Sequence, residues 1–437
     1  MAADEKKQRR FLLISLQALL LCGTVSRHSS ITNMKFKNIL LSVMALAGIA
    51  QAGEPCPQTT TETCDAYRMF YDGPLNIPGE DAPDFKKKLY DATGTGFFFE
   101  LYGAHWDIDN QGAGYESTCN MALLFTQVDQ RLVRDDVNGG TWLSVAGCGS
   151  WGLDHDSAKK HQFYDGGMGI GTGQHTDSVG PAGYYILNAT LRQYFNNKRT
   201  CLNVGVIWMS LYFDRIGHAR FVNDAFEKSP VLPMYYGTPG AVIQHEIDPN
   251  NFVTAAVIGT GLGLGDNPFN LDNTNGWAVV TEYGHHFADG KGTWRVAPFF
   301  CSMDTPGYNG GDEDHNSVGI MTGVEYNVSD RVKVYARLAC ASSEHQRARK
   351  EAMVGTTLRL VPSRPQDYFG ACFGVYKCAD TDNSELVNAY EKVMEFTYHY
   401  ELNKYVSIAP FYQLYIDPAY RNVSTVSATG IQAYLAF

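Results

Sequence analysis

The chain has 437 residues, of which 19% are charged and 13% aromatic, and its formal net charge is −11. Such a composition excludes a disordered or coiled-coil protein, both of which carry more charge and fewer aromatics. The acidic balance, with no Lys/Arg run in the body of the chain, excludes a protein that binds nucleic-acid phosphates.

The first predicted element along the chain is a secretory signal. Basic residues at Lys35 and Lys37 precede a mostly apolar run from Ile39 to Ile49, which ends in Ala50-Gln51-Ala52. A basic start, a short apolar run and an A-x-A end are typical of a cleaved signal peptide. We therefore expect residues 34–52 to be a signal peptide, with cleavage before the glycine that follows.

Residues 1–33 are expected to be an upstream extension. They contain another apolar run, Phe11 to Val25, and the alternative is that this run is a signal anchor. Removing residues 1–52, with seven Lys/Arg and two Asp/Glu, leaves 385 residues with a net charge of −16. No later apolar run approaches the roughly 20 residues that a membrane helix needs. If the exported protein lies in a membrane, it must therefore do so as a closed barrel.

Nine cysteines remain after the predicted cleavage. An odd number leaves at least one unpaired within the chain, and Cys56 and Cys64 are near enough in sequence to bridge in an oxidising compartment. No CxxC pair and no ligand-spaced His/Cys set occurs, so no metal site is predicted. The nine are Cys56, Cys64, Cys119, Cys148, Cys201, Cys301, Cys340, Cys372 and Cys378.

The following part of the chain alternates between apolar and polar residues, as strands do. In Val393–Tyr400 the aromatics share one parity, and after the turn Glu401–Lys404 a second run extends over Tyr405–Tyr415. This pattern predicts a hairpin with one apolar face. Similar pairs of runs are Ala241–Ile247 with Phe252–Ile258, Trp277–Gly284 with Trp294–Phe300, and Ile320–Tyr326 with Val332–Leu338.

A soluble sandwich would also alternate, but further features favour a bilayer. Aromatics crowd near strand ends, and the final predicted strand, Gly430–Phe437, ends in an aromatic residue, as outer-membrane barrels do. Short turns alternate with long polar segments, namely Asp154–Pro181, Asp214–Pro239, Gly265–Asn275, Thr305–Asn316 and Glu344–Ala352.

These features predict an all-β fold, a transmembrane antiparallel β-barrel with long extracellular loops, over residues 93–437. A strand of about 10 residues takes roughly 22–25 with its connection, which allows about 16 strands. Residues 53–92 are expected to form an N-terminal periplasmic head. Phe437 is expected to take part in barrel assembly, because it ends the last strand.

Five blocks of the chain resemble the carbohydrate-selective porins of Gram-negative outer membranes. They are Phe85–Tyr102, Gly205–Pro230 with its "YFD…FxNxAF…P" pattern, Val354–Gly370 with Arg364-Pro365-Gln366-Asp367, Glu395–Tyr400, and Ser407–Pro418. The resemblance is weak between Asp107 and Pro181. The cysteines and the position of Gly430 depart from the family's pattern.

The resemblance implies an outer-membrane channel for passive, selective diffusion of mono- or oligosaccharides. Its implied partners are carbohydrate solutes, outer-membrane lipid and the barrel-assembly machinery, and other porins suggest a homotrimer. Alternatives are a general or weakly cation-selective porin, a barrel that only anchors surface components, and a secreted β-sandwich carbohydrate-binding protein or enzyme. Because no HExxH, GxSxG, Walker or GxGxxG pattern occurs, no enzyme, catalytic residue or cofactor is predicted.

Charged residues spaced evenly within apolar strands are the candidates for the pore constriction. On the lipid face a Lys or Arg would cost about 2–4 kcal/mol at the midplane, so such residues are expected to face the lumen. There, carboxylates and guanidiniums offer paired hydrogen bonds to sugar hydroxyls. The alternative is that they pair across the wall and only solvate the lumen. The predicted constriction residues are Glu282, Arg295, Glu325, Arg337 and Glu395.

Overall fold

The computed structural model describes residues 75–78, 82–109, 118–152, 183–214, 221–233, 237–260, 276–303, 316–343, 346, 348–379 and 386–436. All of them belong to one compact unit, Ala47–Phe437. The predicted upstream extension, the signal peptide, the Cys56–Cys64 bridge and Phe437 lie outside the described residues. None of the helices in the described ranges is long and apolar enough to span a membrane.

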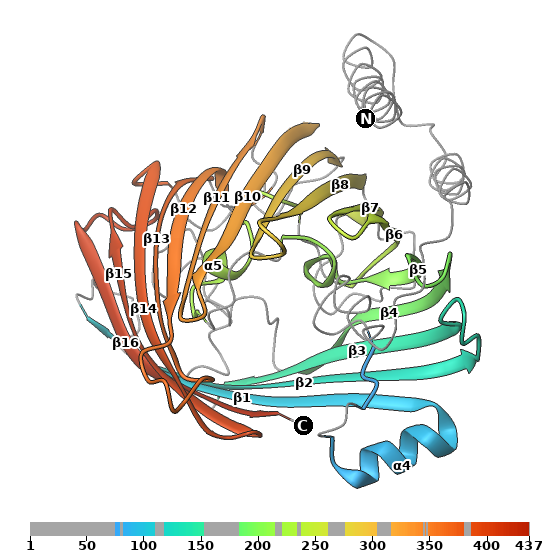
Figure 1. Cartoon of the computed structure of the whole chain (residues 1–437). Helices are drawn as coiled ribbons and strands as arrows, with labels where there is room; N and C mark the ends of the chain where they lie inside the picture. The colour runs from blue at the N-terminus through green and yellow to red at the C-terminus, as the bar shows by residue number, and fades with distance from the viewer. Residues whose placement is uncertain are drawn as a thin grey trace, which may run out of the picture. The chain divides into compact units, whose positions relative to one another are not determined.

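Sixteen antiparallel strands close into one barrel (Figure 1). Each strand pairs with its neighbour in sequence, and β1 pairs with β16 to close the ring. The strands are β1 (Thr95–Asp109), β2 (Thr118–Val133), β3 (Thr141–Gly152), β4 (Gly183–Phe195), β5 (Thr200–Ile207), β6 (Thr238–Asp248), β7 (Asn251–Thr260), β8 (Gly276–Phe287), β9 (Gly292–Met303), β10 (Ser317–Ser329), β11 (Val332–Ala341), β12 (Ala348–Leu358), β13 (Tyr368–Cys378), β14 (Tyr390–Asn403), β15 (Val406–Ile416) and β16 (Thr425–Ala436).

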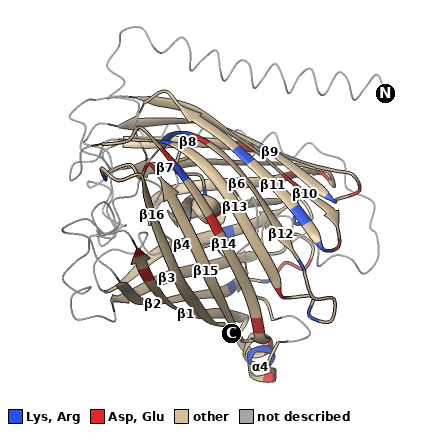
Figure 2. Ribbon diagram, turned by 90° about the vertical axis from the view of Figure 1, so that its left-hand side faces the viewer, with Lys and Arg blue, Asp and Glu red and all other residues tan. Residues whose placement is uncertain are grey.

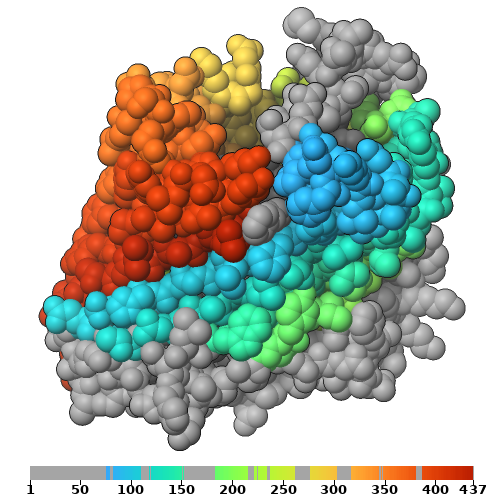
Figure 3. All heavy atoms as spheres, turned by 90° about the horizontal axis from the view of Figure 1, so that it is seen from below, coloured from blue at the N-terminus to red at the C-terminus, as the bar shows by residue number. Residues whose placement is uncertain are grey.

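The predicted barrel of about 16 strands is thus confirmed. A closed ring of neighbouring strands is incompatible with the alternative β-sandwich, which needs two separate sheets. In Figure 3 the closing seam is visible, with β16 in red beside β1 in cyan.

The two faces of the wall follow the predicted alternation. On β11, Val334 and Leu338 are 38% and 57% exposed on the outer face, whereas Tyr335 and Arg337 point inward and are buried. Charged residues occupy few positions along the strands (Figure 2). An apolar outer surface around a more polar interior is the arrangement that a bilayer requires.

Several predicted turns were too long. The turn expected at Glu401–Lys404 begins later, because β14 runs to Asn403. The connection left between the predicted runs Ile320–Tyr326 and Val332–Leu338 is shortened in the same way, because β10 runs to Ser329. In both hairpins the register shifts near the end of the ladder, which lets polar residues continue the pairing. The segment Glu344–Ala352, expected as a loop, contains the start of β12 at Ala348.

Most connections at one end of the barrel are short turns, and most of those at the other end are longer segments. We call these the short-turn end and the long-loop end. The helix α4 (Asp84–Thr93) precedes β1 at the short-turn end and stops at Gly94, whose φ of 72° suits glycine. Two short helical segments, η3 (Met209–Leu211) and α5 (Asp224–Glu227), lie between β5 and β6.

Candidate functional site

The chain between β5 and β6 folds into the barrel. We call its described residues, 208–214, 221–233 and 237, the inward segment, and Figure 1 shows its helix α5 inside the ring of strands. Phe213, Phe221 and Phe226 are 2% exposed or less and share one apolar core with the inner faces of the strands. Burial of these rings drives the segment against the wall.

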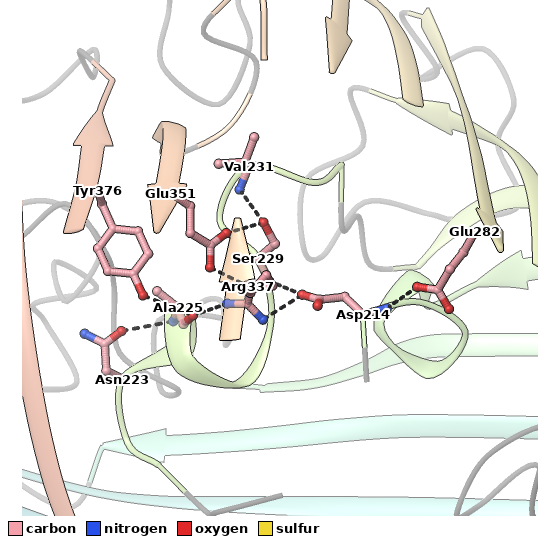
Figure 4. A network of polar contacts seen from close by, with 9 residues as sticks. All are labelled: Asp214, Asn223, Ala225, Ser229, Val231, Glu282, Arg337, Glu351 and Tyr376. Carbon is pink, nitrogen blue, oxygen red and sulfur yellow. Dashed lines mark hydrogen bonds and ion pairs between the residues drawn. The ribbon is translucent and has the colours of Figure 1, made fainter. Parts of the chain in front are cut away.

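Arg337 on β11 joins the barrel wall to the inward segment through hydrogen bonds and ion pairs (Figure 4). Its Nε donates to Glu351 Oε1 on β12 at 2.6 Å, and its Nη1 donates to Asp214 Oδ2 at 2.9 Å. Its Nη2 donates to the carbonyl of Ala225 in α5. All three charged side chains are fully shielded from solvent. A guanidinium suits this position because it presents several donors in a fixed plane.

Ser229 of the inward segment donates hydrogen bonds to the same two carboxylates. Its hydroxyl donates to Glu351 Oε2 at 2.6 Å, and its backbone N–H donates to Asp214 Oδ2. Burial raises the pKa of Asp214 to about 7, although the guanidinium of Arg337 opposes that rise. One guanidinium is therefore shared by two buried carboxylates, and hydrogen bonds from the inward segment complete the cluster.

Glu395 on β14 holds a second point of the inward segment. It accepts hydrogen bonds from the backbone N–H groups of Val222 and Asn223 at 2.6 and 2.8 Å, and from Gln413 Nε2 at 2.8 Å. Asn223 also donates from Nδ2 to the hydroxyl of Tyr415 at 3.1 Å. The carboxylate is fully buried, so backbone donors replace the water that it would otherwise bind.

Glu282 on β8 holds a third point and pairs with Arg295 on β9. Glu282 Oε1 accepts from Arg295 Nη1 at 2.9 Å, and Oε2 accepts the backbone N–H of Asp214 at 3.1 Å. The Arg295 guanidinium also lies 5.0 Å from the centroid of the Phe252 ring. Glu282 is buried, whereas 10% of the Arg295 side chain reaches solvent.

The fifth predicted residue lies elsewhere. Glu325, near the end of β10, pairs with Lys333 of β11 at 3.5 Å, and their side chains are 13% and 23% exposed. The structure therefore brings Glu282, Arg337 and Glu395 directly against the inward segment and places Arg295 beside Glu282. Glu325 lies on the wall towards the short-turn end.

Asp214 and Glu351 were not among the predicted site residues. Both fell within segments expected to be loops, although Asp214 belongs to the "YFD" pattern and Glu351 shares the parity of Met353 within β12. Across the described ranges, no group of three or more His, Cys, Asp or Glu side chains is placed to hold a metal ion. Cys148, Cys201, Cys340, Cys372 and Cys378 are free thiols.

Comparison with known protein families finds a similarity over the second part of the chain. Residues 243–437 match the model of the carbohydrate-selective porin, OprB family. The resemblance to this family is confirmed. The OprB match starts within β6 and contains all five predicted constriction residues, while the inward segment precedes it. A search of curated protein sequences finds no match.

Solved porin structures share the fold. The high-pH structure of Pseudomonas putida OprB is similar with a TM-score of 0.66 at 14% identity, over 84% of this chain and 100% of that one. The low-pH structure of the same protein gives a TM-score of 0.50 at 10% identity, over 82% of this chain and 97% of that one. At such identities the similarity establishes the barrel fold.

Proposed function

We propose that this chain is an outer-membrane channel for the passive, selective diffusion of mono- and oligosaccharides, and that it is not an enzyme. The observation that carries the proposal is the match of residues 243–437 to the carbohydrate-selective porins, in a closed barrel of 16 strands. A barrel of this size leaves room for an aqueous lumen. Its apolar outer face fits outer-membrane lipid.

The inward segment narrows that lumen, and the buried charges of the wall fix its position. Because Glu282, Arg337 and Glu395 are shielded from solvent, we assign them a positioning role. Arg295, Glu325 and Lys333 retain partial exposure on the inner wall. We assign the contacts with sugar hydroxyls to these side chains, because a selective pore for neutral polyols must bind them weakly and repeatedly.

A liposome-swelling assay tests this proposal. Proteoliposomes should swell in isotonic glucose or maltose much faster than in a charged solute of similar size. The matched control is the same lipid without protein. Equal swelling rates for sugars and for charged solutes of equal size would contradict selectivity.

A general or weakly cation-selective porin is the second candidate, and the acidic composition favours it. With a net charge of −11 the chain attracts cations more than anions. A weak cation preference is compatible with sugar passage, since it requires only that small ions leak through the same lumen. The two candidates differ in whether sugars interact with the pore.

Location and assembly follow from the same proposal. Residues 34–52 would direct export, residues 53–92 would form a periplasmic head, and residues 93–437 would be inserted by the barrel-assembly machinery with Phe437 at the end of the last strand. The short-turn end would then face the periplasm. A homotrimer would follow other porins, and analytical ultracentrifugation in detergent would distinguish it from a monomer.

A further inference from the structure

Leu75 and Asn76, which belong to the stretch 53–92 proposed as a periplasmic head, lie inside the barrel mouth. Asn76 donates from both its backbone N–H and its side-chain Nδ2 to Asp129 Oδ2, each at 2.8 Å. Asp129 lies on the inner face of β2, has no solvent exposure and also accepts from Gln127 Nε2 at 2.9 Å. A carboxylate that accepts several N–H groups makes stronger bonds than a neutral acceptor would.

The inner wall fits this segment closely. A Cβ on Gly96 of β1 would lie 1.9 Å from the carbonyl oxygen of Asn76, so only glycine permits this approach. The preceding residue, Leu75, packs against a buried cluster of Trp142, Tyr194 and Cys201, which belong to β3, β4 and β5. The segment therefore contacts the inner faces of five consecutive strands near their short-turn ends.

The helix α4, which follows these residues, packs against the same buried cluster. Tyr90 of α4 stacks on Trp142 with ring centroids 6.3 Å apart, and the Arg131 guanidinium lies 5.3 Å from the Tyr90 ring. Lys86 Nζ donates to the carbonyl of Phe97 on β1 at 3.0 Å. These contacts fix the helix against the barrel end, so the residues before it are directed into the lumen.

We infer that Leu75 and Asn76 form a second constriction, at the short-turn mouth, and that Asp129 is the positioning residue that latches them there. The inference rests on the proposed function, because it places this constriction in series with the inward segment on the path of the solute. A sugar that passes the inward segment meets the Leu75–Asn76 backbone before it leaves the barrel.

Thiol labelling tests the latch without any solute. Cys201 belongs to the buried cluster against which Leu75 packs and is 2% exposed, so its alkylation by a maleimide, mapped by mass spectrometry, reports release of the segment. Replacing Asp129 by Ala should raise the labelling rate of Cys201 at least about tenfold, since hydrogen bonds to a charged acceptor are lost. Cys301, buried on the inner face of β9, should stay protected in both proteins and serves as the internal control.

Single-channel conductance tests the constriction itself. Asp129→Ala should conduct more and admit larger neutral polymers than the parent protein, whereas Asp330→Ala, in the exposed β10–β11 turn, should match the parent. Should Asp129→Ala lose its heat-modifiable migration in detergent gels, the pair Leu75→Gly and Asn76→Ala, outside every strand, replaces it.

The outcomes separate the two proposals. Unchanged protection of Cys201 in a folded variant overturns the latch. Faster labelling with unchanged conductance overturns the second constriction. Faster labelling with higher conductance supports both the latch and the second constriction. An absence of any sugar effect in both proteins would count only against the proposed sugar selectivity.

Discussion

Arg337 and Asp214 are 123 positions apart in the chain and form an ion pair 2.9 Å long with no solvent exposure of either side chain. The pair joins the barrel wall to the inward segment. Because Glu351 binds the same guanidinium, removing Arg337 would leave two buried carboxylates without their cation. Long-range ion pairs therefore hold the inward segment against the barrel wall.

Replacing Arg337 by Ala should release the inward segment and widen the pore. Two buried carboxylates would lose their partner, at a cost of about 3–5 kcal/mol. Planar-bilayer recording should show higher ion conductance and more current noise, with weaker interruption by sugars. Arg337→Lys keeps the charge but not the planar set of donors, so its effect should be intermediate. Conductance equal to the parent in a folded Ala variant would contradict the positioning role.

Replacing Glu395 by Gln should loosen the second attachment point. A neutral amide offers a single acceptor oxygen where the carboxylate now accepts from Val222, Asn223 and Gln413. The lost charge-assisted bonds predict about 1.5–3 kcal/mol less stability of this attachment. Open-channel noise should rise, while Lys392→Gln, which removes a partly exposed ion pair of the same strand, should leave it unchanged. Equal noise in the two variants would contradict the assignment.

If the outer face of the barrel contacts lipid, the loss of stability caused by a charged substitution there should depend on its depth in the bilayer. Val354, midway along β12, is 54% exposed, and Leu360 in the following turn is 57% exposed. Val354→Arg should lose about 2–4 kcal/mol of stability in a bilayer, whereas Leu360→Arg should lose about 0–1. Urea titration of protein folded into lipid vesicles measures both. Equal losses would contradict a membrane-embedded β12.

The turn between β12 and β13 predicts a specific pH dependence. The hydrogen bond from Arg364 lowers the pKa of Asp367, which also accepts the backbone N–H of Glu401 at 3.0 Å. A carboxyl with a depressed folded pKa stabilises the fold above its unfolded value of about 3.9, and that contribution disappears as pH falls through the folded value.

Heat-modifiable migration measured across pH tests this dependence. Asp367→Asn should lower the unfolding temperature at neutral pH. The difference from the parent protein should disappear as pH falls through the lowered pKa of Asp367, because both side chains are then neutral. Asp330→Asn, in an exposed turn, is the control and should not differ from the parent at any pH. A constant difference between Asp367→Asn and the parent down to the lowest pH would contradict an electrostatic origin.

The sequence predicted the features that depend on local alternation. The inward direction of Arg337 and Glu395 follows from period-two patterning, because their neighbours Leu338 and Phe396 are apolar and face outward. The partners of these charges were not predicted, since no local pattern shows that residue 214 reaches residue 337. Glu351 was missed for another reason: the charged run Arg349-Lys350-Glu351 is typical of a loop, yet it continues the β12 ladder past a register shift.

Single-channel recording with glucose, maltose and a phosphate salt presented in turn tests the central claim most directly. The account predicts that the sugars interrupt the ion current in a concentration-dependent and saturable way, with weak cation preference and no comparable block by phosphate. A channel with normal open conductance that no sugar interrupts at any concentration would contradict it and would identify a general porin.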